Sequence, residues 1–145
     1  MNSPSTDPLP VMPAVLLLED NAPYRALLTE MLTLAGFDVS AAPDGRRVAE
    51  VLAEKRIDLV ITDVVMPERD GIETLTALHY SHPRLPLLVI SGDLPLNMHL
   101  YLTIAEKLGA ARVLAKPFKM EALVAAAREA IAARNPAAAP AAGDP

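Results

Sequence analysis

The chain of 145 residues contains no cysteine and no tryptophan, and aromatic residues make up only 3% of it. Without cysteine, disulfide bonds, thiolate metal ligands and cysteine nucleophiles are all excluded. The hydrophobic core must therefore be built from aliphatic side chains, which a hydrophobic content of 52% supplies in sufficient number. A chain of this length can form one domain with a proper core.

Long apolar segments and an excess of positive charge are also missing. No apolar run approaches the roughly 18 residues that a membrane-spanning helix needs, and the N-terminal residues lack the basic and apolar regions of a signal peptide. The formal net charge of −5 gives no electrostatic reason to expect nucleic-acid binding. We therefore expect a cytoplasmic protein that binds neither a membrane nor a nucleic acid.

Short apolar runs alternate with helical patterns along most of the chain. Continuous apolar runs are typical of parallel strands that are covered on both faces, and their alternation with helices predicts a parallel sheet joined by right-handed crossovers. The first helix is delimited by Asn21 as N-cap, Pro23 in the first turn and Gly36 as a stop. We predict strands over residues 14–18, 37–41, 59–63, 87–91 and 112–115, and further helices over residues 46–55, 72–80, 96–108 and 120–134.

The two ends of the chain differ in composition from the part between them. Residues 1–13 contain four prolines and residues 135–145 are rich in alanine and proline, so we expect a flexible N-terminal tail and a disordered C-terminal tail. Residues 14–134 would then form a single domain. Within it, an apolar stripe on the first helix is expected to face the sheet; its members are Leu27, Leu28, Met31, Leu32 and Leu34.

Polar side chains follow four of the five predicted strands. Glu19 and Asp20 follow the first strand, Asp63 ends the third, Ser91 ends the fourth and Lys116 follows the fifth. Taken singly, each has an ordinary explanation as a helix cap, a turn residue or a surface lysine. In an open α/β sheet, however, ligands bind just beyond the carboxyl ends of the strands, where all five side chains would meet.

The residue types at these strand ends suit phosphoryl chemistry. Carboxylates that lie close together repel each other, and a hard divalent cation such as Mg²⁺ relieves the repulsion through oxygen ligands. A carboxylate facing a phosphoryl donor can act as a nucleophile and form an aspartyl phosphate. A lysine ammonium can balance the charge on the phosphoryl oxygens, and a serine hydroxyl can donate a hydrogen bond to one of them.

Together these motifs resemble the receiver domain of bacterial two-component response regulators, the CheY-like family. The resemblance covers residues 14–134 and implies a flavodoxin-like, three-layer α/β fold, with a five-stranded parallel sheet in the order 2-1-3-4-5 and five helices on both faces. Its motifs in this sequence are Glu19-Asp20, Asp63 with Met66-Pro67 and Gly71, Ser91-Gly92 and Lys116-Pro117-Phe118.

The resemblance assigns a role to each acidic residue at these strand ends. Asp63 would accept a phosphoryl group from a histidine kinase or a histidine phosphotransfer protein. Glu19, Asp20, Asp63 and the backbone carbonyl of Val65 would bind Mg²⁺. The protein would assist its own phosphorylation and dephosphorylation without being an enzyme in the ordinary sense.

The remaining motif residues would contact the phosphoryl group or transmit the signal that it has arrived. Ser91 would move toward it, Lys116 would contact its oxygens, and the bond before Pro117 would be cis. Phosphorylation would change the surface of the fourth helix, the fifth strand and the fifth helix. Many receivers carry an aromatic switch residue three positions before the lysine. Val113 stands there instead and has no ring to turn, so backbone movement after Ser91 would have to carry the signal.

The sequence is compatible with three functional interpretations. The preferred one is a stand-alone response regulator, monomeric or weakly dimeric, that signals to an unknown downstream protein. A second is a receiver-fold interaction scaffold that is never phosphorylated. A third is a phosphatase with an aspartyl nucleophile, but that class typically has an acid two residues after the nucleophile, where Val65 stands here.

Overall fold

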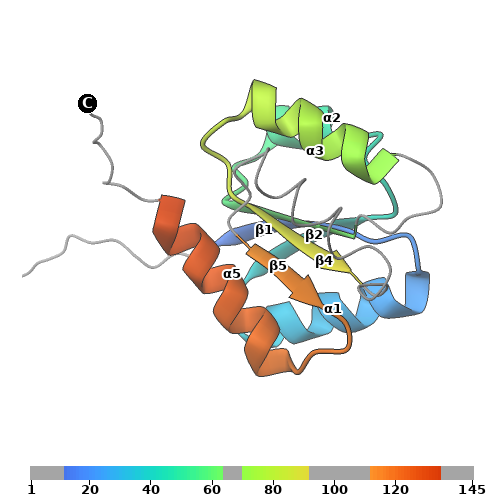
Figure 1. The fold of residues 1–145 in the computed structure, drawn as a ribbon, viewed down its shortest axis with the longest axis vertical. Helices are drawn as coiled ribbons and strands as arrows, with labels where there is room; N and C mark the ends of the chain where they lie inside the picture. The colour runs from blue at the N-terminus through green and yellow to red at the C-terminus, as the bar shows by residue number, and fades with distance from the viewer. Residues whose placement is uncertain (1–11, 64–69, 92–111, 135–145) are drawn as a thin grey trace, which may run out of the picture.

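Five parallel strands form one sheet in the order β2-β1-β3-β4-β5 (Figure 1). The computed structural model describes residues 12–63, 70–91 and 112–134. This order is the one predicted, and it confirms the flavodoxin-like fold class. The strands are β1 (Ala14–Leu18), β2 (Asp38–Ala42), β3 (Leu59–Asp63), β4 (Leu87–Ser91) and β5 (Arg112–Ala115).

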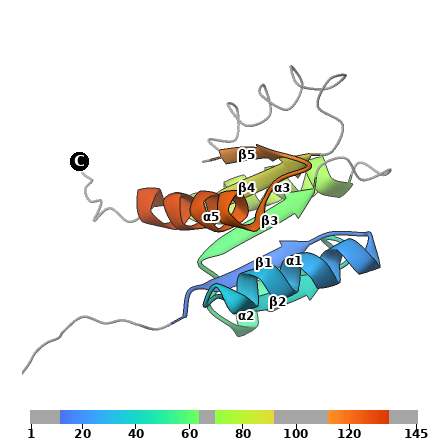
Figure 2. The same ribbon diagram turned by 90° about the horizontal axis from the view of Figure 1, so that it is seen from below.

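Helices cover both faces of the sheet. Helices α1 (Ala22–Leu34) and α5 (Met120–Arg134) lie on one face, and α2 (Val48–Glu54) and α3 (Asp70–Ser81) lie on the other (Figures 1 and 2). The fourth predicted helix, over residues 96–108, lies outside the described residues. Among the helices in the described ranges, none is long and apolar enough to cross a membrane.

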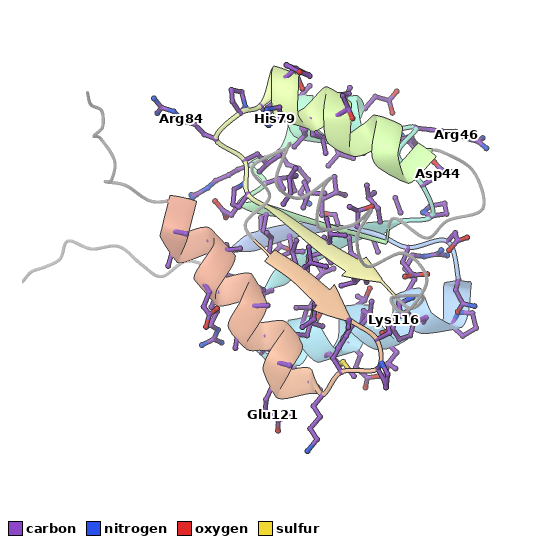
Figure 3. The ribbon with its side chains drawn as sticks, in the orientation of Figure 1. Asp44, Arg46, His79, Arg84, Lys116 and Glu121 are labelled. Carbon is purple, nitrogen blue, oxygen red and sulfur yellow. The ribbon has the colours of Figure 1, made fainter. Side chains whose placement is uncertain are left out.

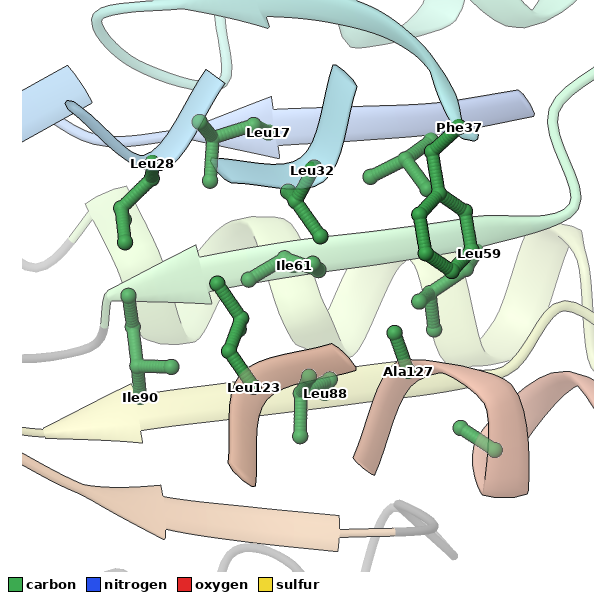
Figure 4. Packing of buried hydrophobic residues seen from close by; sticks show 12 residues of the cluster. Leu17, Leu28, Leu32, Phe37, Leu59, Ile61, Leu88, Ile90, Leu123 and Ala127 are labelled. Carbon is green, nitrogen blue, oxygen red and sulfur yellow. The ribbon is translucent and has the colours of Figure 1, made fainter. Parts of the chain in front are cut away.

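The core consists of two layers, because successive side chains of a strand point to opposite faces of the sheet. In β1, Leu16 and Leu18 pack toward α2 and α3, whereas Val15 and Leu17 pack toward α1 and α5. Figure 4 shows part of the second layer, where Leu17 lies among side chains of α1, β3 and α5. Every residue of β1 is buried, which explains its continuous apolar sequence.

Helix α1 begins and ends where its sequence predicts. The Asn21 side chain accepts a hydrogen bond from the Tyr24 amide at 2.8 Å, and Gly36 adopts a φ of 101°, a conformation that favours glycine. Past the helix end, the amides of Gly36 and Phe37 donate to the carbonyls of Thr33 and Leu32, the pairing of a Schellman motif.

This helix end explains why β2 starts one residue later than predicted. The Phe37 amide is used by α1, so the ladder with β1 begins at Asp38, which is in register with Ala14. Helix α2 is likewise shorter than the predicted range of 46–55. The Arg46 amide donates to the Asp44 carboxylate at 2.9 Å in a turn, and the helix begins only at Val48.

The predicted apolar stripe of α1 is partly wrong. Leu28 and Leu32 are fully buried, but Leu27 is 45% exposed and Leu34 is 72% exposed. Leu28 and Leu32, four residues apart, lie on the helix face that meets the sheet, and Met31 beside them packs partly against the same core layer. Leu27 and Leu34 are seven residues apart, so they share a neighbouring face that points away from it.

The two leucine environments give a matched pair of variants. We expect Leu17→Ala to lower the free energy of unfolding by about 3 kcal/mol, because Leu17 is fully buried and its removal leaves a cavity. We expect Leu34→Ala to change it by less than about 0.5 kcal/mol, because that side chain is mostly in solvent. Urea unfolding of both variants measures the difference. Equal losses would contradict the burial assigned to β1.

The N-cap of α1 can be tested in the same way. Asn21→Ala removes the acceptor for the Tyr24 amide, and we expect a loss of about 1 kcal/mol in the free energy of unfolding. Asn21→Ser keeps an acceptor at this position and serves as the control, with most of the stability retained. Thermal or urea unfolding of the two variants measures the difference in their free energies of unfolding. A serine variant as unstable as the alanine variant would show that another feature of Asn21 matters.

Candidate functional site

The register of the sheet brings the predicted acidic residues to one edge. Strands β1 and β3 pair in parallel with Leu18 opposite Thr62. Glu19 and Asp63 each follow this pair by one residue, at the carboxyl end of the two central strands. Asp63 is itself in register with Ile90 of β4. The position predicted to accept a phosphoryl group therefore lies next to the position of the first carboxylate.

The same edge continues to the fifth strand. Ser91 is in register with Ala115, the last residue of β5. Lys116 follows directly, and its peptide bond to Pro117 is cis. Figure 3 shows Lys116 beyond the end of β5, next to α1. Four strands thus deliver their terminal polar residues to one end of the sheet.

The Glu19 carboxylate is 1% exposed and is held from several directions. The Asn21 amide donates to Glu19 Oε2 at 3.1 Å. The Glu19 backbone is fixed as well: its amide donates to the Ala42 carbonyl of β2 at 3.0 Å, and the Arg25 guanidinium donates to its carbonyl at 2.8 Å. By contrast, Asp20 is exposed to solvent. The two acids thus combine a fixed, buried carboxylate with an accessible one.

The Lys116 ammonium is the cation beside the Glu19 carboxylate. Its Nζ lies 3.7 Å from Glu19 Oε1, and the Lys116 side chain is only 24% exposed. Nζ also lies 4.4 Å from the centroid of the Tyr24 ring, within the range of a cation–π interaction. The Tyr24 ring in turn packs against Phe118, with 6.5 Å between the ring centroids and 54° between the planes.

The sequence did not predict the roles of three further residues at this site. Arg25 fixes the carbonyl of Glu19, Tyr24 lies against Lys116, and the backbone amide of Asn21 binds the buried carboxylate. All three belong to the start of α1, directly after the acidic pair. Their position in the first turn, beside the strand ends, was the available signal.

Some predicted site residues can be placed only by their backbone. Val65 lies outside the described residues, and for Asp63 and Ser91 only the strand positions are described. Val113, which stands where many receivers have an aromatic residue, is half-buried and packs against the core layer on the α2 and α3 face. It pairs in register with Val89.

The donor chemistry at this edge fits Mg²⁺. The described donors, Glu19 and Asp20, are oxygen ligands, with no histidine or thiolate among the residues that flank them, and hard divalent cations prefer such a set. Within the described side chains, no group of three acidic or histidine residues converges on one point. The third predicted carboxylate, Asp63, lies outside that search because its side chain is not described.

A groove of about 440 Å³ lies elsewhere, along α1. It shares Arg25 with the candidate site but contains neither Glu19 nor Lys116, so the groove is not where the polar strand ends meet. It is lined by Ala22, Arg25, Ala26, Thr29, Glu30, Thr33, Leu34 and Ala41.

Comparison with known proteins places the chain among response regulators. The family model of the response regulator receiver domain matches residues 15–128. The transcriptional regulatory protein CpxR of Escherichia coli K12 is 37% identical over 117 residues, which cover 81% of this chain and 48% of CpxR. The C4-dicarboxylate transport transcriptional regulatory protein DctD of Pseudomonas aeruginosa is 33% identical over 130 residues, covering 88% of this chain and 27% of DctD.

Solved structures agree with this placement. The chemotaxis response regulator CheY4 of Vibrio cholerae superposes with a TM-score of 0.71 at 27% identity, covering 83% of this chain and 99% of CheY4. Full-length FixJ from B. japonicum superposes with a TM-score of 0.77 at 30% identity, covering 88% of this chain and 62% of FixJ.

The curated relatives are longer than the matched region. This chain spans about half of CpxR and about a quarter of DctD, so the stand-alone character predicted from the sequence stays a prediction. The receiver match covers most of the chain, and the sheet order and the placement of the polar strand ends agree with it. The chain therefore belongs to the receiver domain family of two-component response regulators.

Proposed function

We propose that this chain accepts a phosphoryl group on Asp63 from a histidine kinase or a histidine phosphotransfer protein and passes the signal to a downstream protein. One observation carries the proposal. The Lys116 ammonium lies 3.7 Å from the buried Glu19 carboxylate at the sheet edge where β3 ends on Asp63. A carboxylate paired with an ammonium group, next to an aspartate at a strand end, is an arrangement suited to phosphoryl transfer.

The transfer step can be written for the proposed donor, a phosphohistidine. A carboxylate oxygen of Asp63 attacks phosphorus and forms a P–O bond. The P–N bond of the donor breaks, and its electron pair stays on the imidazole nitrogen, which takes up a proton. Lys116 neutralises charge on the phosphoryl oxygens, and the hydroxyl of Ser91 donates to one of them.

The same groups support loss of the phosphoryl group. Water attacks phosphorus, the P–O bond to Asp63 breaks, and inorganic phosphate leaves while the Asp63 carboxylate is restored. The chain then promotes its own phosphorylation and dephosphorylation and acts as a self-limiting switch, not as an enzyme that turns over a separate substrate.

Receiver domains of this family bind Mg²⁺ at the phosphorylation site. In this chain the proposed ligands are the carboxylates of Glu19, Asp20 and Asp63 and the backbone carbonyl of Val65. Bound Mg²⁺ would supply positive charge against the carboxylates and the phosphoryl oxygens. Glu19 is well suited to the role, because the Asn21 amide and the Arg25 guanidinium already fix its position.

The output surface is proposed to include β5, α5 and the fourth predicted helix, of which only the first two are described. Val113 supports a route that involves no ring rotation in β5, because its side chain is packed against the core layer and is stiff at χ1. A downstream protein would then recognise a change in the backbone after Ser91. Screening for binding partners would identify this downstream protein.

Phosphoryl uptake is the direct test. We expect intact mass to rise by one phosphoryl group when the protein is incubated with acetyl phosphate and Mg²⁺, because Asp63 attacks the small donor in the same way. Asp63→Ala and addition of EDTA should both abolish the increase. Asp38→Ala, which removes an exposed carboxylate on β2, is the matched control and should leave uptake unchanged.

The opposite result has a clear meaning. If the folded protein gains no mass with acetyl phosphate or with any phosphorylated kinase or phosphotransfer protein offered to it, the phosphoacceptor role is wrong. The chain would then act as an interaction scaffold with a receiver fold. Uptake that persists in Asp63→Ala would instead place the acceptor at another residue.

Metal binding gives a second prediction. We expect Asp20→Asn and Glu19→Gln each to weaken Mg²⁺ binding by about tenfold or more, because each removes one anionic ligand while keeping nearly the same side-chain volume. Asp38→Asn should not change the affinity. Calorimetric titration with Mg²⁺ measures the dissociation constants. Unchanged affinity in both site variants would show that the cation binds elsewhere.

A further inference from the structure

Two of the groups beside the Lys116 ammonium differ in kind. On one side is the Glu19 carboxylate, with 3.7 Å between Nζ and Oε1. On the other is the face of the Tyr24 ring, with 4.4 Å between Nζ and the centroid. The carboxylate belongs to the proposed Mg²⁺ site, whereas the ring is neutral and belongs to none of the roles described so far.

Both the backbone and the ring of Tyr24 are held by neighbouring groups. The Tyr24 amide donates to the Asn21 side chain at 2.8 Å, which fixes the first turn of α1. On the far side, the ring packs against Phe118, just after the cis bond that follows Lys116. Tyr24 and Phe118 also pack against the core layer shared by α1 and α5. The ring is therefore a fixed surface that links α1 to the segment after β5.

A fixed ring changes what a lysine can do. The ammonium sits on a flexible four-carbon stem, so placing it costs conformational entropy each time it must meet a phosphoryl oxygen. The negative face of an aromatic ring attracts the ammonium without forming a hydrogen bond that would have to be broken. Part of the ordering is thus done before the phosphoryl group arrives.

We propose that Tyr24 is a positioning residue for Lys116: its ring holds the ammonium at the carboxyl edge of the sheet and thereby sets the rate at which Asp63 takes up a phosphoryl group. The part about rate rests on the proposed phosphoacceptor function. The part about position does not, because it concerns the protein before any phosphoryl group arrives.

The position is tested without phosphorylation. An aromatic ring shifts the NMR signals of protons above its face upfield, so the ε-methylene protons of Lys116 should resonate upfield of those of the exposed Lys119. We expect Tyr24→Phe to keep the shift and Tyr24→Leu to abolish it. Tyr80→Leu removes a ring that is 77% exposed on α3 and should leave the shift unchanged. A shift that survives in Tyr24→Leu would overturn the proposal.

The effect on rate is tested by following phosphoryl uptake from acetyl phosphate. We expect Tyr24→Leu to slow uptake by roughly threefold to tenfold, the range that a partly buried cation–π contact predicts. Tyr24→Phe keeps the ring and should stay within about twofold of the unaltered protein. Thermal unfolding of each variant checks that the fold is intact.

A double variant separates positioning from a general structural effect. Lys116→Met removes the ammonium but keeps an apolar stem against the ring. In that background, Tyr24→Leu should cause no further slowing, because its effect acts through the lysine. An equal slowing in both backgrounds would show that Tyr24 acts on the fold alone and would overturn the proposal. If the unaltered protein takes up no phosphoryl group, the proposed function fails, and the NMR result alone decides on Tyr24.

Discussion

The burial of the Glu19 carboxylate is the constraint on which the rest of this edge depends. A buried charge is strongly destabilising unless it is paired and hydrogen-bonded. Two parts of the chain meet that requirement: the N-cap of α1 supplies the Asn21 amide, and the segment after β5 supplies Lys116. The carbonyl of Ala42 fixes the Glu19 backbone in addition. The position of α1 and the end of β5 are thereby coupled to the same carboxylate.

Much of the fold could be predicted because its determinants are local. A buried parallel strand requires a continuous apolar run, and β1 and β4 each have one. Helix α1 carries its own start and stop signals in Asn21 and Gly36, and both act as expected. The edge at which the polar residues meet also follows from the sequence, because parallel strands joined by right-handed crossovers must end on the same side.

Most of what could not be predicted depends on how the elements pack against one another. The exposure of Leu34 depends on how α1 is rotated against the sheet. The start of β2 is the exception, because the Phe37 amide bonds to the Leu32 carbonyl five residues earlier, which an apolar run does not reveal. The contact between Tyr24 and Lys116 joins residues on two different elements. Sequence periodicity reports on one element at a time, so the strand ends predicted the place of Lys116 but gave no sign that Tyr24 of α1 contacts it.

The location of the aromatic ring bears on how such a site can transmit a signal. In this chain β5 offers Val113, a stiff side chain packed in the core, while the ring beside the lysine is Tyr24 of α1 and its packing partner is Phe118. Movement of the Lys116 ammonium would therefore change its contact with a ring that also packs against Phe118, two residues before α5. The free energy of that contact is modest, so the ring can bias the lysine without trapping it. With Asp63 as the proposed acceptor, coupling to α5 would run from Lys116 through Tyr24 to Phe118, in place of a rotating side chain in β5.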